Sequence, residues 1–192
     1  MTDAELMAKI KKDWGPAIRA AVAGTPFPEA LLAAIAANES SGDINATRFE
    51  AAELGEFALV FVGKRADYQG LGAEDLVGAL SGVFSVRAAA GRLVDWCTSW
   101  GPTQIMGWQS IKAKYAIADL LDPTKHFYHT ACMLAAFQKQ FALRDQEFMA
   151  VPWDQYFRCW NTGNPSAPTS DPNYVTHGLA RMRLYTAGPV LV

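Results

Sequence analysis

The stretch "PEALLAAIAANESSG", residues 28 to 42, decides how the chain is interpreted. On a helix, four of its positions fall at i, i+3, i+4 and i+7 and share one stripe: Leu32, Ile35, Ala36 and Glu39. Pro28 suits the first turn of this helix, and Gly42 is typical of the position just beyond a helix end. A carboxylate therefore stands where the pattern predicts a residue facing the core.

We expect the pKa of the Glu39 carboxyl to be raised, because an apolar environment and the carbonyl groups of the last helical turn both disfavour a negative charge. A raised pKa keeps a carboxyl protonated near neutral pH, as a general acid requires. The alternative is that the apolar stripe ends one turn earlier and Glu39 points into solvent, as most charged residues do.

The composition predicts one packed globular domain. The chain has 192 residues, of which 51% are hydrophobic and 19% are charged, so it can bury a core and is unlike a disordered segment. The formal net charge of −2 gives no reason to expect binding to nucleic acid or to an anionic membrane.

Neither a signal peptide nor a membrane span is evident, so we expect synthesis in the cytoplasm without a signal peptide and no membrane insertion. Three cysteines, an odd number without a CxxC pair, predict buried thiols rather than a disulfide framework. They are Cys97, Cys132 and Cys159.

Helices are predicted along most of the chain. Thr2 and Glu5 form a capping box for a first helix that runs to about Val22, and the second helix ends near Ser40. Asp122 begins a long helix that we expect to be central. This long helix is predicted to cover residues 123–144. The remaining predicted helices cover residues 85–97, briefly 103–115, 152–160 and 171–185. Residues 43–83 are predicted to form an irregular or β excursion, with a β-like run at 57–62.

Four motifs resemble segments of one superfamily. They are "NESSG" (38–42), "RFEAAELGEF" (48–57), "TSWGPTQIMGWQ" (98–109) and "YFRCWNTGN" (156–164). Together they resemble the lysozyme-like superfamily, in particular phage N-acetylmuramidase and soluble lytic transglycosylase domains. The motifs occur in the family's order and span positions 30 to 163.

The resemblance implies a mainly α, lysozyme-like (α+β) fold with a central long helix. It also implies a single catalytic domain over residues 1–192, without a separate wall-binding domain, whose cleft binds glycan strands of peptidoglycan. Five positions depart from the family's pattern: Ala51, Ala52, Pro102, Thr103 and Trp160.

Carried over by resemblance, Glu39 is the general acid that protonates the glycosidic oxygen between N-acetylmuramic acid and N-acetylglucosamine, and then acts as a base. Glu50 matches the second acidic residue of the motif and could activate a water, with Glu53 and Glu56 as competitors or with all three in a solvated loop. The substrate-binding candidates are Ser40, Ser41, Gln104, Trp160 and Asn161.

Each substrate-binding candidate also has a structural alternative. Ser40 and Ser41 could simply end a helix, and Gln104 could satisfy buried backbone groups. Trp160 could belong to the core, and Asn161 could begin the following turn.

A metal site is geometrically possible on the long helix, where three potential ligands lie about one turn apart: His126, His129 and Cys132. No partner motif accompanies them, so we expect no metal and no cofactor.

The resulting hypothesis is a peptidoglycan-cleaving muramidase or lytic transglycosylase. We expect a monomeric phage or prophage endolysin that acts on the periplasmic cell wall after holin release or from the virion. The alternatives are a non-catalytic glycan-binding or virion structural protein with this fold and a chitinase-like glycosidase.

Overall fold

The structure is a computed structural model that describes residues 1–143 and 152–187. It is mainly helical, which confirms the predicted class. The helices are α1 (Asp3–Val22), α2 (Glu29–Ser40), α3 (Ala51–Phe61), α4 (Ala73–Ala79), α5 (Val86–Trp96), α6 (Gln109–Ala113), the 3₁₀ helix η1 (Ile117–Leu121), α7 (Pro123–Phe141), α8 (Trp153–Thr162) and α9 (Tyr174–Ala187). The strands are β1 (Thr47–Phe49), β2 (Asp67–Tyr68), β3 (Leu71–Gly72), β4 (Thr98–Trp100) and β5 (Ile105–Met106).

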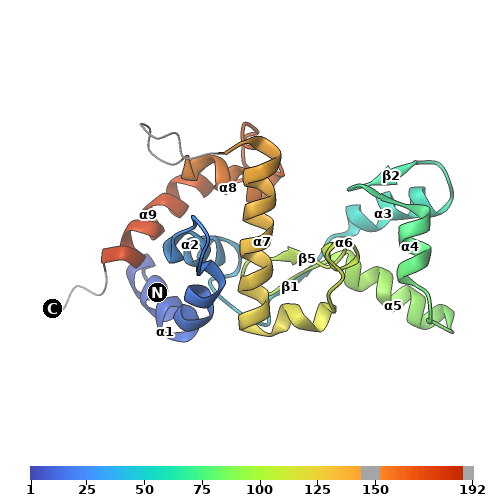
Figure 1. Cartoon of the computed structure of the whole chain (residues 1–192), viewed down its shortest axis with the longest axis horizontal. Coiled ribbons are helices and arrows are strands. Elements are labelled where there is room, and N and C mark those ends of the chain that lie inside the picture. The colour runs from blue at the N-terminus through green and yellow to red at the C-terminus, as the bar shows by residue number, and fades with distance from the viewer. Residues whose placement is uncertain (144–151, 188–192) are drawn as a thin grey trace.

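The elements gather into two lobes with a small sheet between them (Figure 1). The helical lobe contains α1, α2, α7, α8 and α9, and the small lobe contains α3 to α6 with the hairpin β2–β3. The sheet is antiparallel in the order β1–β4–β5, with Arg48 opposite Ser99 and Ser99 opposite Met106. Each lobe has its own cluster of buried apolar side chains.

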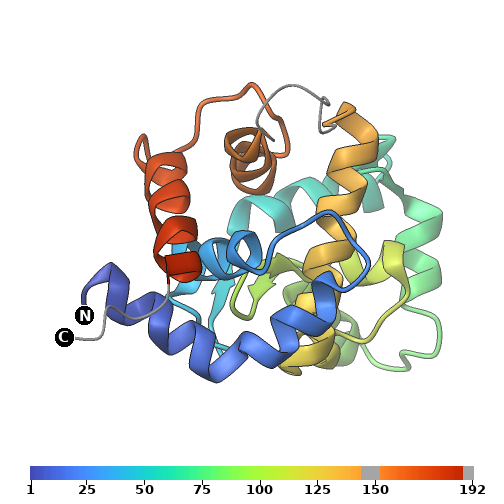
Figure 2. The same cartoon turned by 60° about the vertical axis from the view of Figure 1, so that its left-hand side comes forward.

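Helix α2 is the centre of the helical lobe. Every residue from Ala30 to Ala37 is buried, so the helix is covered on all sides rather than along one stripe. Figure 2 shows α1 and α9 beside it. At twelve residues α2 is too short for a bilayer, and no helix within the described ranges has the length and apolar character to cross one.

The long helix α7, predicted to be central, lies between the rest of the helical lobe and the small lobe (Figure 1) but is covered along one face only. Helix α7 buries five side chains on one face, namely His126, Phe127, Thr130, Ala131 and Leu134, and exposes the opposite face. The physical reason is composition, because residues 30 to 37 contain no polar side chain whereas α7 carries Lys125 and Lys139 on its surface.

The ends of the first two helices form as predicted. The Thr2 hydroxyl accepts a hydrogen bond from the Glu5 amide, and the Glu5 carboxylate accepts one from the Thr2 amide. Gly42 has φ +75°, and a Cβ there would lie 2.7 Å from a side-chain carbon of Ile10. Because only glycine fits, α2 ends tightly against α1, where Trp14 Nε1 donates to the Gly42 carbonyl at 2.8 Å.

The β-like run at 57–62 is helical, so this prediction is wrong. Phe57 and Val60 are buried at i and i+3, while Leu59 and Val62 are exposed, which is helical and not alternating spacing. Short strands instead occupy residues 98–100 and 105–106, where the sequence predicts a break and a helix. The expectation of short elements across 43–83 is confirmed by β1, α3, β2, β3 and α4.

Two of the three predicted buried thiols are buried, Cys97 and Cys159. Cys132 is exposed, because it lies on the outer face of α7. The predicted end of the long helix at Arg144 lies outside the described residues.

Candidate active site

Glu39 lies in the last turn of α2, where its Oε1 accepts a hydrogen bond from the hydroxyl of Tyr174. Burial raises the pKa of the Glu39 carboxyl, while the Tyr174 hydrogen bond and the positive charge of Arg48 lower it to a smaller extent. The direction agrees with the sequence-based expectation. Glu39 as a residue is half-buried, so it is not fully enclosed by the protein.

Tyr174 is fixed from two sides. Its ring is buried and packs edge-on against Phe157, with ring centroids 6.2 Å apart. Its carbonyl accepts a hydrogen bond from Asn38 Nδ2 at 2.9 Å. Burial and the adjacent Glu39 carboxyl raise the pKa of the Tyr174 hydroxyl, so it remains a donor toward Glu39.

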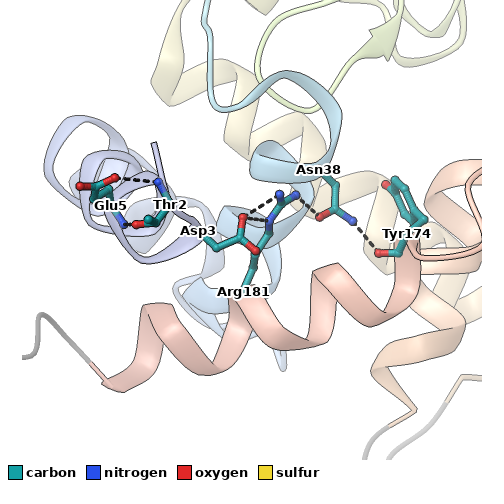
Figure 3. A network of polar contacts seen from close by, with 6 residues as sticks. All are labelled: Thr2, Asp3, Glu5, Asn38, Tyr174 and Arg181. Carbon is teal, nitrogen blue, oxygen red and sulfur yellow. Dashed lines mark hydrogen bonds and ion pairs between the residues drawn. The ribbon is translucent and has the colours of Figure 1, made fainter.

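The support of Tyr174 extends to the start of the chain (Figure 3). Arg181 Nη1 donates to Asn38 Oδ1 at 2.8 Å, and Arg181 Nη2 donates to Asp3 Oδ1 at 2.9 Å. Asp3 is the first residue of α1 and lies between Thr2 and Glu5, the two residues of the capping box. One chain of polar contacts thus joins α1, α2 and α9 beside Glu39.

Arg48 connects the two predicted catalytic carboxyls. Its Nε donates to Glu50 Oε1, and its charge acts on Glu39. The Arg48 side chain is 70% exposed and that of Glu50 is 31% exposed. Glu50 therefore pairs with the guanidinium whose charge acts on Glu39.

The loop 101–104, within the Ser-Trp-Gly motif, is held by three helices. The Ser40 hydroxyl donates to the Pro102 carbonyl at 2.8 Å, and Trp160 Nε1 donates to the Thr103 carbonyl at 2.9 Å. From α7, His126 Nε2 accepts a hydrogen bond from the Thr103 amide at 3.2 Å. Three predicted motifs meet here, because Ser40, Thr103 and Trp160 come from different ones.

The side-chain amide of Gln104 forms its hydrogen bonds with the protein itself. Its amide nitrogen donates to the carbonyls of Gly101 and Ala46 at 2.9 and 3.3 Å, and its oxygen accepts from the Ser99 hydroxyl at 2.7 Å. These contacts correspond to the backbone-satisfying alternative, so Gln104 orders the loop and the sheet edge. Its φ of +56° adds to the tight turn between β4 and β5.

Two further candidates lie apart from these contacts. Asn161 Oδ1 accepts a hydrogen bond from the Ser170 amide at 3.3 Å, and Asn161 lies one turn beyond Phe157, the residue packed on Tyr174. Ser41 adopts φ +57° and is exposed at the end of α2. Asn161 therefore lies on the same helix, α8, as the ring that packs on Tyr174. Ser41 is the residue at which α2 ends.

His126 serves the fold. Its Nδ1 lies 2.9 Å from the Leu120 carbonyl, which only accepts, so Nδ1 carries the proton and Nε2 accepts from Thr103. Burial lowers the pKa of His126 to about 4, so the ring is neutral at pH 7. His129 stacks on Tyr115, with centroids 3.9 Å apart. The described residues hold no group of three or more His, Cys, Asp or Glu suited to a metal ion.

A second half-buried glutamate, Glu53, belongs to the small lobe. Its Oε1 accepts a hydrogen bond from the Tyr68 hydroxyl at 2.9 Å. Its Oε2 and the Trp108 Nε1 are both buried, and neither has a hydrogen-bond partner of normal geometry in the described ranges. Burial raises the pKa of Glu53, and the negative charges of Glu50 and Glu56 raise it further.

Two residues of the site are absent from the sequence-based list. Tyr174 lies 135 positions from Glu39, so no local pattern could identify it. Arg48 had a local signal, because residues two apart in an extended strand share a side and Arg48 is two before Glu50.

No family model, curated protein or solved structure matches this chain. The lysozyme-like resemblance therefore stays a prediction based on the four motifs.

Proposed function

We propose that this protein is a glycosidase that cleaves the β-1,4 bond between N-acetylmuramic acid and N-acetylglucosamine in peptidoglycan, with Glu39 as general acid and base. The observation that carries the proposal is the Glu39 carboxyl itself, which has a raised pKa and a fixed hydroxyl donor in Tyr174 and belongs to a half-buried residue. The resemblance of four motifs to lysozyme-like domains supports the same reaction.

In the first step the protonated Glu39 gives its proton to the glycosidic oxygen as the C–O bond breaks. Loss of the proton leaves a carboxylate that the Tyr174 hydroxyl and the Arg48 charge stabilise, since both favour the charged form. The carboxylate then removes a proton from the attacking group in the second step. The substrate's own N-acetyl group, which the resemblance implicates, would assist the departure of the leaving sugar.

Glu50 is assigned a supporting role in this proposal. Its hydrogen bond to Arg48 orients the guanidinium that stabilises ionised Glu39. This assignment differs from that of a second carboxylate that activates water, and the two are separable by mutation.

The proposal is tested by Glu39→Gln, which preserves the hydrogen-bond acceptor for Tyr174 and removes the proton. We expect release of soluble fragments from purified peptidoglycan to fall roughly 10²- to 10⁴-fold, the usual contribution of proton transfer. Circular dichroism and the melting temperature check that the variant folds. Release at the rate of the unaltered protein would refute the mechanism.

The products decide between water and the substrate's C6 hydroxyl as the attacking group. Mass spectrometry distinguishes a reducing muramic acid end, made by a hydrolase, from a 1,6-anhydro end that is one water lighter, made by a lytic transglycosylase. Chitooligomers, which lack the lactyl ether, separate this activity from that of a chitinase-like enzyme. In its biological setting we propose a phage or prophage endolysin that reaches the wall after holin release or in the virion.

A second candidate function is glycan binding without turnover. Gln104 and Trp160, two predicted sugar contacts, direct their polar atoms to the protein, so this alternative, like the first, does not depend on their polar groups. This alternative predicts sedimentation with peptidoglycan without any soluble fragments.

A further inference from the structure

A hollow of about 610 Å³ lies in the small lobe, where α4, α5 and α6 meet, and Glu39 does not line it. Its size falls within the usual range for small-ligand sites. Part of its wall is apolar, formed by Trp96, Ile111 and Ile117. The hollow plays no part in the mechanism proposed above.

Charges of both signs line the hollow. Helix α4 contributes Glu74 and Asp75, α5 contributes Arg92, and Lys114 follows the end of α6. Asp75 accepts a hydrogen bond from the Gly72 amide at 2.9 Å. In the ranges that the structure covers, none of these four residues forms an ion pair within 4 Å. The hollow is therefore lined by negative and positive side chains that do not form ion pairs with one another in the described ranges.

Tyr115, one of the residues that line the hollow, carries a buried hydroxyl without a hydrogen-bond partner among residues 1–143 and 152–187. Burial raises the pKa of Tyr115, so the hydroxyl is a donor at neutral pH. Because a buried donor without an acceptor is unfavourable, a ligand carbonyl that reached it would gain a hydrogen bond.

We propose that this hollow binds a short zwitterionic peptide with small apolar side chains. A carboxylate of the peptide would face Arg92 and Lys114, an ammonium group would face Glu74, and a methyl side chain would contact the apolar wall. A purely anionic or purely cationic ligand would meet a like charge on one side. The choice of ligand rests on the proposed function, since the stem peptides of peptidoglycan combine alanine, several carboxylates and, in many bacteria, a free amine.

The test is calorimetric titration of the intact protein with the tripeptide L-Ala–γ-D-Glu–meso-diaminopimelate at low salt, where charge pairs are least screened. We expect saturable binding at one site that weakens when the amine is acetylated or the carboxylates are amidated. Arg92→Gln and Glu74→Gln should each weaken it about 3- to 10-fold, as loss of one charge contact would. Lys12→Gln, an exposed cation on α1, is the matched control and should leave binding unchanged.

Absence of saturable binding at millimolar peptide, or equal binding by all four proteins, would overturn the inference. Melting temperatures of the variants show whether they fold. The tripeptide has no glycosidic bond, so this result is independent of catalysis. If peptide binding fails while Glu39→Gln abolishes fragment release, only the inference is wrong. If the peptide binds while Glu39→Gln remains fully active, only the proposed mechanism is wrong.

Discussion

The two lobes each contain a half-buried carboxyl paired with a tyrosine, and the two pairs differ in what surrounds them. Glu39 of the helical lobe receives a hydrogen bond from Tyr174, and Glu53 of the small lobe receives one from Tyr68. Burial is the largest cause of the raised pKa of both. A carboxyl, a phenol and burial are therefore not sufficient to distinguish a general acid.

The surrounding charges separate the pairs. Arg48 favours the ionised form of Glu39, whereas Glu50 and Glu56 disfavour the ionised form of Glu53. A general acid must lose its proton during the reaction and then exist as an anion. Of the two carboxyls, only Glu39 has a cation among residues 1–143 and 152–187 that stabilises this anion, which is why we assign the proton transfer to it.

The most direct test of this contrast replaces each acid with its amide. Glu39→Gln should lower kcat by roughly 10²- to 10⁴-fold, and Glu53→Gln should change it less than about threefold, because Glu53 hydrogen-bonds to Tyr68 within the small lobe. Fragment release from peptidoglycan measures both variants. A loss with Glu53→Gln as large as that with Glu39→Gln, in a folded protein, would reverse the assignment.

Removal of the phenol hydroxyls sharpens the comparison. Tyr174→Phe deletes a contact that lowers the pKa of Glu39, so the basic limb of the activity profile should move to higher pH and kcat should fall roughly tenfold. Tyr68→Phe should leave the profile in place and lower the free energy of unfolding by about 1 kcal/mol. The pH dependence of kcat/KM and urea denaturation provide these two measurements. An unmoved basic limb in Tyr174→Phe would argue against Glu39 as the titrating acid.

The roles of Arg48 and Glu50 give a smaller effect. Glu50→Gln should reduce kcat/KM less than about fivefold if Glu50 only orients Arg48, since surface ion pairs contribute little. Arg48→Gln should move the basic limb to higher pH, and Arg48→Lys should restore much of its position. A loss of 10²-fold or more in Glu50→Gln would instead identify Glu50 as the group that activates water.

The smallest expected effect is that of Glu39→Gln on the melting temperature. This substitution should raise Tm at high pH although it lowers activity. The pKa of Glu39 is raised in the folded state, so its neutral form contributes fully below the unfolded-state pKa and this contribution is lost as pH rises through the folded-state pKa. Glutamine does not ionise, so Glu39→Gln should have a Tm close to that of the unaltered protein at pH 4 and a higher Tm at pH 8. Calorimetry at both pH values measures the difference, and a lower Tm at pH 8 would contradict it.

Local signals in the sequence predicted the parts of the fold that depend on neighbouring residues. The capping box of Thr2 and Glu5 and the Asp122 cap fixed helix starts, because their hydrogen bonds span only three residues. The strand predicted at 57–62 was wrong because its apolar residues suit a strand as well as a buried helix face. Tertiary packing, which the local sequence does not record, determines which of the two forms.

The residues of the candidate site also differ in whether the local sequence predicts them. Glu39 was predictable because it continues the apolar stripe of Leu32, Ile35 and Ala36 at helical spacing. Its partner Tyr174 depends on the docking of α9 against α2, which no short pattern records. Gln104 and Trp160 were assigned to substrate from their motifs, whereas the structure shows that their hydrogen bonds hold the loop 101–104.

The contact between Asp3 and Arg181 has a practical consequence for anyone who alters the ends of this protein. Arg181 holds Asn38, and Asn38 holds the Tyr174 carbonyl, so the environment of the acid depends on the third residue of the chain. Trimming residues 1–3 or fusing a bulky tag to them would disturb that support from a distance. A tag fused there is expected to change the activity, so activities measured with and without the tag should not be compared directly.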